Sequence, residues 1–323
     1  MEFSPLSRNM QYNNSNMVTE FLLLGFQNLQ SFKICFYLLL LVIYCVTVCG
    51  NLLIILVVSS SRSLHSPMYF FLTQLSFSDI LISTTIVPNM LHIVLYEGSS
   101  LSFIRCLMQF YFFSASESLE CFILSVMSYD RYQAICNPLH YSSVMTITFC
   151  LKAVLLCWVL MFAVTLNLPV SISRLQFCGP NPNIIDHFFC DLDPILQLSC
   201  SSTFFIKIED MILAVPTVIC PFLVIVVSYV CIIITILKIP SVTGRQKTFS
   251  TCSSHLTVVS LFYVSIICIY LFPNMENIKK TISVFYTVIT PLLNPLIYSL
   301  QNRAIKQAFK KLKRKSSAVL QMS

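Results

Sequence analysis

Long apolar segments alternate with short polar ones along almost the whole chain. A helix that crosses a bilayer needs about 20 mostly apolar residues. This pattern predicts seven spans, at 32–58, 67–94, 103–134, 146–170, 205–237, 247–272 and 281–300. Because the apolar runs are continuous and do not alternate in polarity, they favour helices over the strands of a barrel.

The composition agrees with a membrane protein. Of the 323 residues, 56% are hydrophobic and 10% are charged, whereas about a quarter of a soluble domain is charged. We find no phosphate-binding glycine motif and no zinc-protease motif, so nothing indicates an enzyme. The fold class that we predict is an all-α bundle of seven transmembrane helices.

The distribution of Lys and Arg predicts the orientation of the bundle. If the C-terminus is cytoplasmic, 13 of the 20 basic residues lie on that side, which accounts for the net charge of +7 without nucleic acid. We therefore expect an extracellular tail at 1–31, a membrane domain at 32–300 and a cytoplasmic tail at 301–323. Asn13, in the motif Asn13-Asn14-Ser15, is a candidate glycosylation site in the outer tail.

The cytoplasmic tail has the pattern of a short amphipathic helix at 303–315. Its apolar positions share one face and are Ile305, Ala308, Phe309 and Leu312. Lysines occupy the rest of its surface, so we expect this helix to bind the lipid of the inner leaflet. A solvated basic tail is the alternative.

Of the 15 cysteines, four are expected outside the membrane, where disulfides form: Cys106, Cys178, Cys190 and Cys200. Four cysteines allow three pairings, and their spacing does not select one. No paired C-x-x-C motifs are present, so a zinc site is not expected.

Ionisable residues inside spans are costly and indicate functional positions. Asp79 and Glu120 lie at mid-membrane depth, where a sodium ion or a proton could neutralise them. Glu117 lies one helical turn nearer the outside, where it could receive a ligand or bond across the bundle. Asp130 and Arg131 could form an ion pair that changes partners, or Arg131 could be an interfacial anchor.

Several longer motifs are distributed along the chain between residues 64 and 295. They are Leu64–Leu72 (LHSPMYFFL), Met127–Cys136 (MSYDRYQAIC), Pro138–Tyr141 (PLHY), Lys247–Leu256 (KTFSTCSSHL) and Pro291–Pro295 (PLLNP). With these motifs the chain resembles the rhodopsin-like G-protein-coupled receptors, and among them the odorant (olfactory) receptors.

The resemblance implies the disulfides Cys106–Cys190 and Cys178–Cys200. It implies an inner switch, which comprises Asp130, Arg131, Tyr132, Tyr229 and Tyr298. It also implies an odorant ligand, an olfactory stimulatory G protein and a cAMP signal at the plasma membrane. Helix position alone gives the candidate ligand residues, which are Phe113, Ser114, Glu117, Ser118, Asp210, Ala214, Ile266, Tyr270 and Thr287.

Some positions depart from the family pattern. Gln133 stands where valine is usual and Gln301 where arginine is usual, and both substitutions bear on G-protein coupling. The main alternative function is a receptor of the same fold for another small molecule outside the nose. An ion-coupled transporter is a remote alternative, because the chain lacks two related halves.

Overall fold

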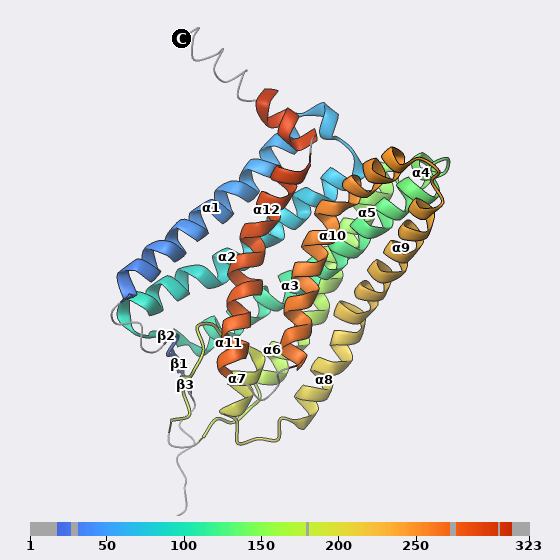
Figure 1. Cartoon of the computed structure of the whole chain (residues 1–323). Helices are drawn as coiled ribbons and strands as arrows, with labels where there is room; N and C mark the ends of the chain where they lie inside the picture. Colours follow the sequence, from blue (N-terminus) through green and yellow to red (C-terminus); the bar gives the residue numbers. More distant parts are fainter. Residues whose placement is uncertain (1–17, 27–31, 179–180, 272–275, 303, 312–323) are drawn as a thin grey trace, which may run out of the picture.

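The computed structural model describes residues 18–26, 32–178, 181–271, 276–302 and 304–311. Within these residues, seven helices are long and apolar enough to cross a membrane, as predicted. They pack as one bundle (Figure 1). The first three are α1 (Lys33–Ser60), α2 (Pro67–Tyr96) and α3 (Phe103–Cys136), and the fourth is α5 (Ile147–Thr165), which continues as α6 (Asn167–Ile172).

The fifth and seventh spans are each interrupted by a π-helical turn. The fifth comprises α8 (Phe204–Ala214), η2 (Val215–Ile219) and α9 (Cys220–Leu237). The seventh comprises α11 (Glu276–Val284), η3 (Phe285–Ile289) and α12 (Thr290–Gln301). The sixth, α10 (Val242–Leu271), starts five residues before its predicted start at 247.

The surface and the interior of the bundle have the polarity that lipid requires. Large apolar side chains point outward, for example Leu155 at 65% and Val227 at 61% exposure. Polar side chains such as Asn51, Asp79 and Ser128 are fully buried. Because hydrocarbon offers no hydrogen bonds, this arrangement hides the polar groups among protein partners.

A small sheet lies at one end of the bundle, which we call the strand end (Figure 1). Its central strand β1 (Glu20–Leu23) pairs antiparallel with β2 (Ser99–Ser102) and parallel with β3 (Ile184–Ile185). Together with the short helix α7 (Leu192–Gln197) these strands form what we call the cap. The side chains of Phe21 and Leu23 are fully buried beneath it.

Two disulfides lie at the strand end. Cys106 at the start of α3 is bonded to Cys190, and Cys178 is bonded to Cys200, with Cα–Cα distances of 5.5 and 5.7 Å. These are the two pairs that the family resemblance implies. The first joins α3 to the chain between α6 and α8, and the second closes a loop within that chain.

The opposite end, which we call the tail end, carries the turn η1 (Arg62–Leu64), the short helix α4 (Tyr141–Val144) and a helix at 304–311. Ile305 and Ala308 on this last helix are buried in the bundle core. The apolar face that we expected to meet lipid therefore packs mainly against protein, because the bundle offers it an apolar surface. Leu312 and the rest of the tail lie outside the described residues.

Gly25 in the cap has a φ of +62°, and a Cβ there would collide with Cγ2 of Ile93. We expect Gly25→Ala to lower the free energy of unfolding by about 1–3 kcal/mol, because alanine is strained in this conformation. Thermal unfolding of the purified protein would measure the loss. Gly244→Ala, at an ordinary helical φ in α10, is the control, and an equal effect of both variants would contradict the prediction.

Candidate functional site

A cavity of about 360 Å³ lies below the cap at the strand end of the bundle. Its walls come from α3, α5, α6, α8, η2, α10, α11 and η3, and the chain around α7 covers it. Seven predicted ligand residues line it: Phe113, Ser114, Glu117, Ser118, Asp210, Ala214 and Ile266. Its volume falls in the range of small-molecule sites.

Two predicted residues are placed differently. Thr287 does not line this cavity, because it is fully buried and its hydroxyl donates to the Ser283 carbonyl oxygen at 2.6 Å. Its position at the π-helical turn η3 turns Thr287 into the bundle, while its neighbour Tyr286 lines the cavity. The side chain of Tyr270 lies outside the described part of α10.

The cavity has one apolar side. The ring of Phe113 packs against Phe189 at 5.1 Å and against Tyr286 at 5.8 Å between ring centroids. Phe110, Leu213 and other aliphatic side chains extend this wall. It would accommodate a hydrocarbon ligand body.

The lining also contains four acidic residues. Glu117 comes from α3, Asp210 from α8, and Asp191 and Asp193 from the chain at α7. Burial, followed by the neighbouring carboxylates, raises the pKa of Asp191 to about 6. The only basic residue among the described lining residues is Lys279, whose Nζ lies 2.7 Å from an Asp193 oxygen.

Asp191, Asp193 and Lys279 were not among the predicted ligand residues. Asp191 directly follows Cys190, and the disulfide from Cys190 to Cys106 of α3 therefore holds Asp191 at the cavity. The sequence contains this signal, since an acidic residue beside a bridged cysteine must lie close to the helix that the bridge reaches. The Cys106–Cys190 pairing is implied only by the family resemblance, so the spacing of the cysteines alone does not place Asp191 near α3.

Deeper in the bundle, a polar cluster surrounds Asp79. Asn294 Nδ2 donates to Asp79 Oδ1 at 2.9 Å, and Glu120 lies close enough to interact with Asp79. Four buried oxygens in this region lack a hydrogen-bond partner among the described residues: Asp79 Oδ2, Glu120 Oε1, Ser116 Oγ and Asn294 Oδ1. Such a set of oxygens suits a hard cation or a shared proton.

At the tail end, Asp130 is the centre of a second polar cluster. Its carboxylate pairs with Arg131, whose Nε lies 2.9 Å away, and accepts a hydrogen bond from the Tyr141 hydroxyl at 2.8 Å. Asp130 is fully buried. The predicted ion pair is therefore formed here, and Tyr141 is a partner that the sequence did not suggest.

The other predicted switch residues lie around this cluster. The hydroxyl of Tyr229 shares a hydrogen bond with His255 Nδ1 at 2.7 Å, so Tyr229 joins α9 to α10. Tyr298 of α12 is fully buried, and its hydroxyl has no hydrogen-bond partner among the described residues. Tyr132 stacks beside Tyr129 at 6.2 Å.

Gln133 is buried and bonded within α3. It donates to the Tyr129 hydroxyl at 2.7 Å and accepts from Asn137 at 3.3 Å. This substitution therefore adds a polar group with its own partners to the tail end of α3. The side chain of Gln301 lies outside the described residues.

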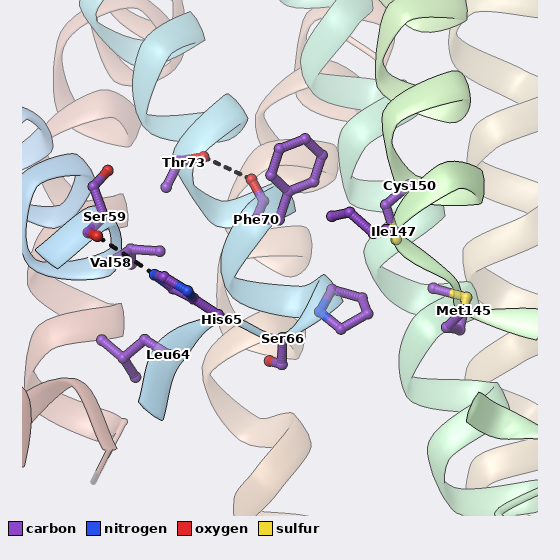
Figure 2. Close-up of a pocket in the computed structure, with 11 residues that line it drawn as sticks. Val58, Ser59, Leu64, His65, Ser66, Phe70, Thr73, Met145, Ile147 and Cys150 are labelled. Atoms are coloured by element: carbon purple, nitrogen blue, oxygen red, sulfur yellow. Dashed lines mark hydrogen bonds between the residues drawn. The ribbon is translucent and has the colours of Figure 1, made fainter. Parts of the chain in front are cut away.

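A separate cavity of about 510 Å³ lies at the tail end, between the start of α2 and the start of α5 (Figure 2). Its lining includes His65, Phe70, Met145, Ile147 and Cys150. His65 Nε2 lies 3.4 Å from the Ser59 carbonyl oxygen, and no carboxylate or ammonium group lines the space. It therefore lacks the charged groups that line the cavity below the cap.

His187, between β3 and α7, is a buried ionisable group near the cap. Its ring packs against Phe188 and Phe189 at 4.6 and 4.7 Å, and its carbonyl oxygen accepts from the Gly25 amide. Burial, followed by the nearby charge of Lys280, lowers the pKa of His187 to about 3. The folded cap therefore holds this histidine neutral.

Comparison with known proteins gives a consistent result. A family model described as "Olfactory receptor" matches residues 40–315. Olfactory receptor 11L1 of Homo sapiens is 45% identical over 314 residues, which are 96% of this chain and 97% of the relative. Olfactory receptor 6B1 of Homo sapiens is 45% identical over 306 residues (94% and 97%), and Olfactory receptor 1468 of Rattus norvegicus is 44% identical over 302 residues (93% and 96%).

Because His187 is neutral in the folded cap but gains a proton near pH 6.5 when unfolded, acid should destabilise the protein. Between pH 6.5 and 3 the unfolded state binds the additional proton. At pH 5 we expect a loss of about 2 kcal/mol relative to neutral pH from this group alone.

Thermal unfolding at pH 7 and pH 5 would measure the effect, with His187→Phe as the comparison. Asp191 titrates with the opposite sign: its pKa is raised to about 6 in the folded state, so the folded state binds the proton first and acid increases stability between pH 6 and 3.8. It is present in both proteins, so the difference between them isolates His187. Equal acid sensitivity in both would contradict the assignment.

Proposed function

We propose that this chain, which belongs to the olfactory receptor family of G-protein-coupled receptors, binds a small odorant in the cavity below the cap and activates a stimulatory G protein at the tail end. The members of this family are multi-pass plasma membrane proteins and are not enzymes. The strand end then faces outward and the tail end faces the cytoplasm. Activation would raise cAMP through adenylyl cyclase.

The observation that carries this proposal is that α3 lines both sites. Phe113 and Glu117 lie in its outer half and line the cavity. Asp130 and Arg131 lie near its other end, in the polar cluster with Tyr141. A ligand that shifts α3 against its neighbours could therefore change the partners of Arg131.

The orientation is supported by the basic residues. Thirteen of the 20 Lys and Arg residues belong to the side that this orientation makes cytoplasmic. Both disulfides then lie on the oxidising side. Asn13 would also lie there as a glycosylation site, although it is outside the described residues.

The ligand acts by preferring one of two arrangements of the bundle. In the present arrangement Asp130 holds Arg131 and accepts from Tyr141, while Tyr229 bonds to His255 on α10. In the active arrangement Arg131 would leave Asp130 and become available to the G protein as α10 moves. A preference of about 1.4 kcal/mol would change the ratio of the two states tenfold.

We expect Arg131→Ala to abolish the odorant-dependent cAMP signal, because it removes the group that meets the G protein. Asp130→Asn should raise the signal in the absence of odorant several-fold, because it removes the charge that holds Arg131. A cAMP assay in cells expressing the receptor with the stimulatory G protein would measure both.

Surface labelling of each variant controls for expression, and Tyr141→Phe is the milder variant. It removes one hydrogen bond to Asp130 and leaves the ion pair in place, so its effect should lie between those of the wild type and Asp130→Asn. If the Arg131→Ala protein reached the surface and signalled normally, the proposed role of the Asp130–Arg131 pair would be wrong.

We also propose that Asp79 and Glu120 hold a sodium ion, with oxygens of Ser116 and Asn294 nearby to complete the set. The ion would supply positive charge between two buried carboxyl groups. Sodium chloride should then raise the melting temperature of the purified receptor above its value in choline chloride at equal ionic strength.

The variants Asp79→Asn and Glu120→Gln should each reduce this sodium effect. Glu117→Gln, one turn along α3 and in the cavity, is the matched control and should keep it. If the wild type is equally stable in both salts, the sodium proposal fails and a shared proton is the remaining explanation.

A further inference from the structure

We infer that the cavity below the cap selects an organic cation, namely an amine on a compact hydrocarbon body; this inference rests on the proposed function of the cavity as the ligand site. The charges of the lining give the first reason. Four carboxyl groups line the cavity, from Glu117, Asp191, Asp193 and Asp210. Lys279 is the one basic residue among the described lining residues.

Lys279 does not neutralise all four carboxyl groups. Its ammonium group is paired with Asp193, at the more exposed side of the cavity. Glu117 and Asp210 have no hydrogen bond among the described residues, although they come from helices that face each other across the cavity. Among the described residues, the Asp191 carboxylate accepts one hydrogen bond, from the Leu192 amide at 2.8 Å.

The hydrogen-bond donors of the lining give a second, independent reason. Four of its hydroxyl groups already donate within the protein: Ser114 to Phe110, Thr165 to Met161, Thr217 to Leu213, and Tyr286 to Ser283. Among the described lining hydroxyls, Ser118 alone has no partner. The polar groups of the lining that remain free to bind a ligand are therefore mainly hydrogen-bond acceptors.

A ligand for such a site must bring donors and positive charge. A protonated primary amine has three N–H donors and no acceptor, so it matches a lining whose free groups are mainly acceptors. An alcohol brings one donor and no charge, and a carboxylate would be repelled by the acidic side of the cavity. Inside a low-dielectric bundle these differences are larger than in water.

The apolar part of the lining fits the rest of the ligand. Phe113 and Tyr286 present aromatic rings, which favour contact with a cation as well as with hydrocarbon. Leu213, Ile266 and Ile269 complete an aliphatic surface. A cavity of about 360 Å³ is near the lower bound of ligand sites, which favours a short alkyl or aryl amine.

The test compares compounds of equal length that differ in one group. Hexylamine, 1-hexanol and hexanoic acid, with benzylamine and benzyl alcohol as an aryl pair, would be assayed for cAMP response. In parallel, their stabilisation of the purified receptor would be measured by thermal unfolding, which needs no G protein. We expect each amine to act at about tenfold or more lower concentration than its alcohol, a difference of about 1.4 kcal/mol.

Two variants locate the effect. Glu117→Gln and Asp210→Asn keep the shape of the side chains but remove the charge, and each should raise the amine concentration needed about tenfold or more, with little effect on the alcohols. Glu209→Gln is the matched control. It removes a carboxylate beside Asp210 on α8 that accepts from Ser171 and does not line the cavity, so the amine response should be unchanged.

The outcomes separate this inference from the proposed function. If alcohols or the acid activate the receptor and amines do not, the cation selectivity is wrong and the odorant-receptor function stands. If amines stabilise the purified receptor in a manner that depends on Glu117 but no cAMP signal follows, the selectivity stands and the proposed coupling is wrong. If amines neither stabilise nor activate the receptor, or if the Glu117 and Asp210 variants respond to them as the wild type does, the inference is overturned.

Discussion

Lipid cannot hydrogen-bond to a polar group, so every polar group that the bundle buries must find its partner inside the protein. This constraint organises the structure into clusters at three depths. Glu117 faces a cavity, Asp79 bonds to Asn294, and Asp130 is held by Arg131 and Tyr141. The bond between Asp79 and Asn294 joins α2 to α12, which are distant in sequence, whereas the Asp130 cluster joins the end of α3 to the short helix α4 that follows it.

The helix α3 is common to all three clusters, because it contributes Glu117, Glu120 and Asp130 along its length. It also packs against α2, α5 and α9. Its strand end is fixed to the chain around α7 by the bond between Cys106 and Cys190. The proposed ligand would contact both the helix and the chain that the bond holds against it, and α3 would then connect the cavity to the Asp130 cluster.

The positions of the spans could be predicted because each one is a property of a continuous segment. A run of apolar residues is sufficient to define a helix that crosses a bilayer. The cap could not be predicted, because β1 is four residues long and its partners β2 and β3 are distant in sequence. The π-helical turns η2 and η3 were also missed, since Pro216 or Pro291 indicates a local disturbance without saying which hydrogen bonds replace the usual ones.

The two ends of α3 also differ in how much of their polar surroundings the sequence predicts. Asp130 and Arg131 are adjacent in sequence, so their pairing could be proposed from the motif itself. The acidic side of the cavity comes from α3, α8 and the chain at α7, and a disulfide brings the last of these into place. Helix position placed Glu117 and Asp210, but Asp191 and Asp193 belong to the start of α7, a helix of six residues that is too short to show a periodicity. The charge of the cavity, and with it the class of ligand, is therefore a property of the assembled fold that no single segment contains.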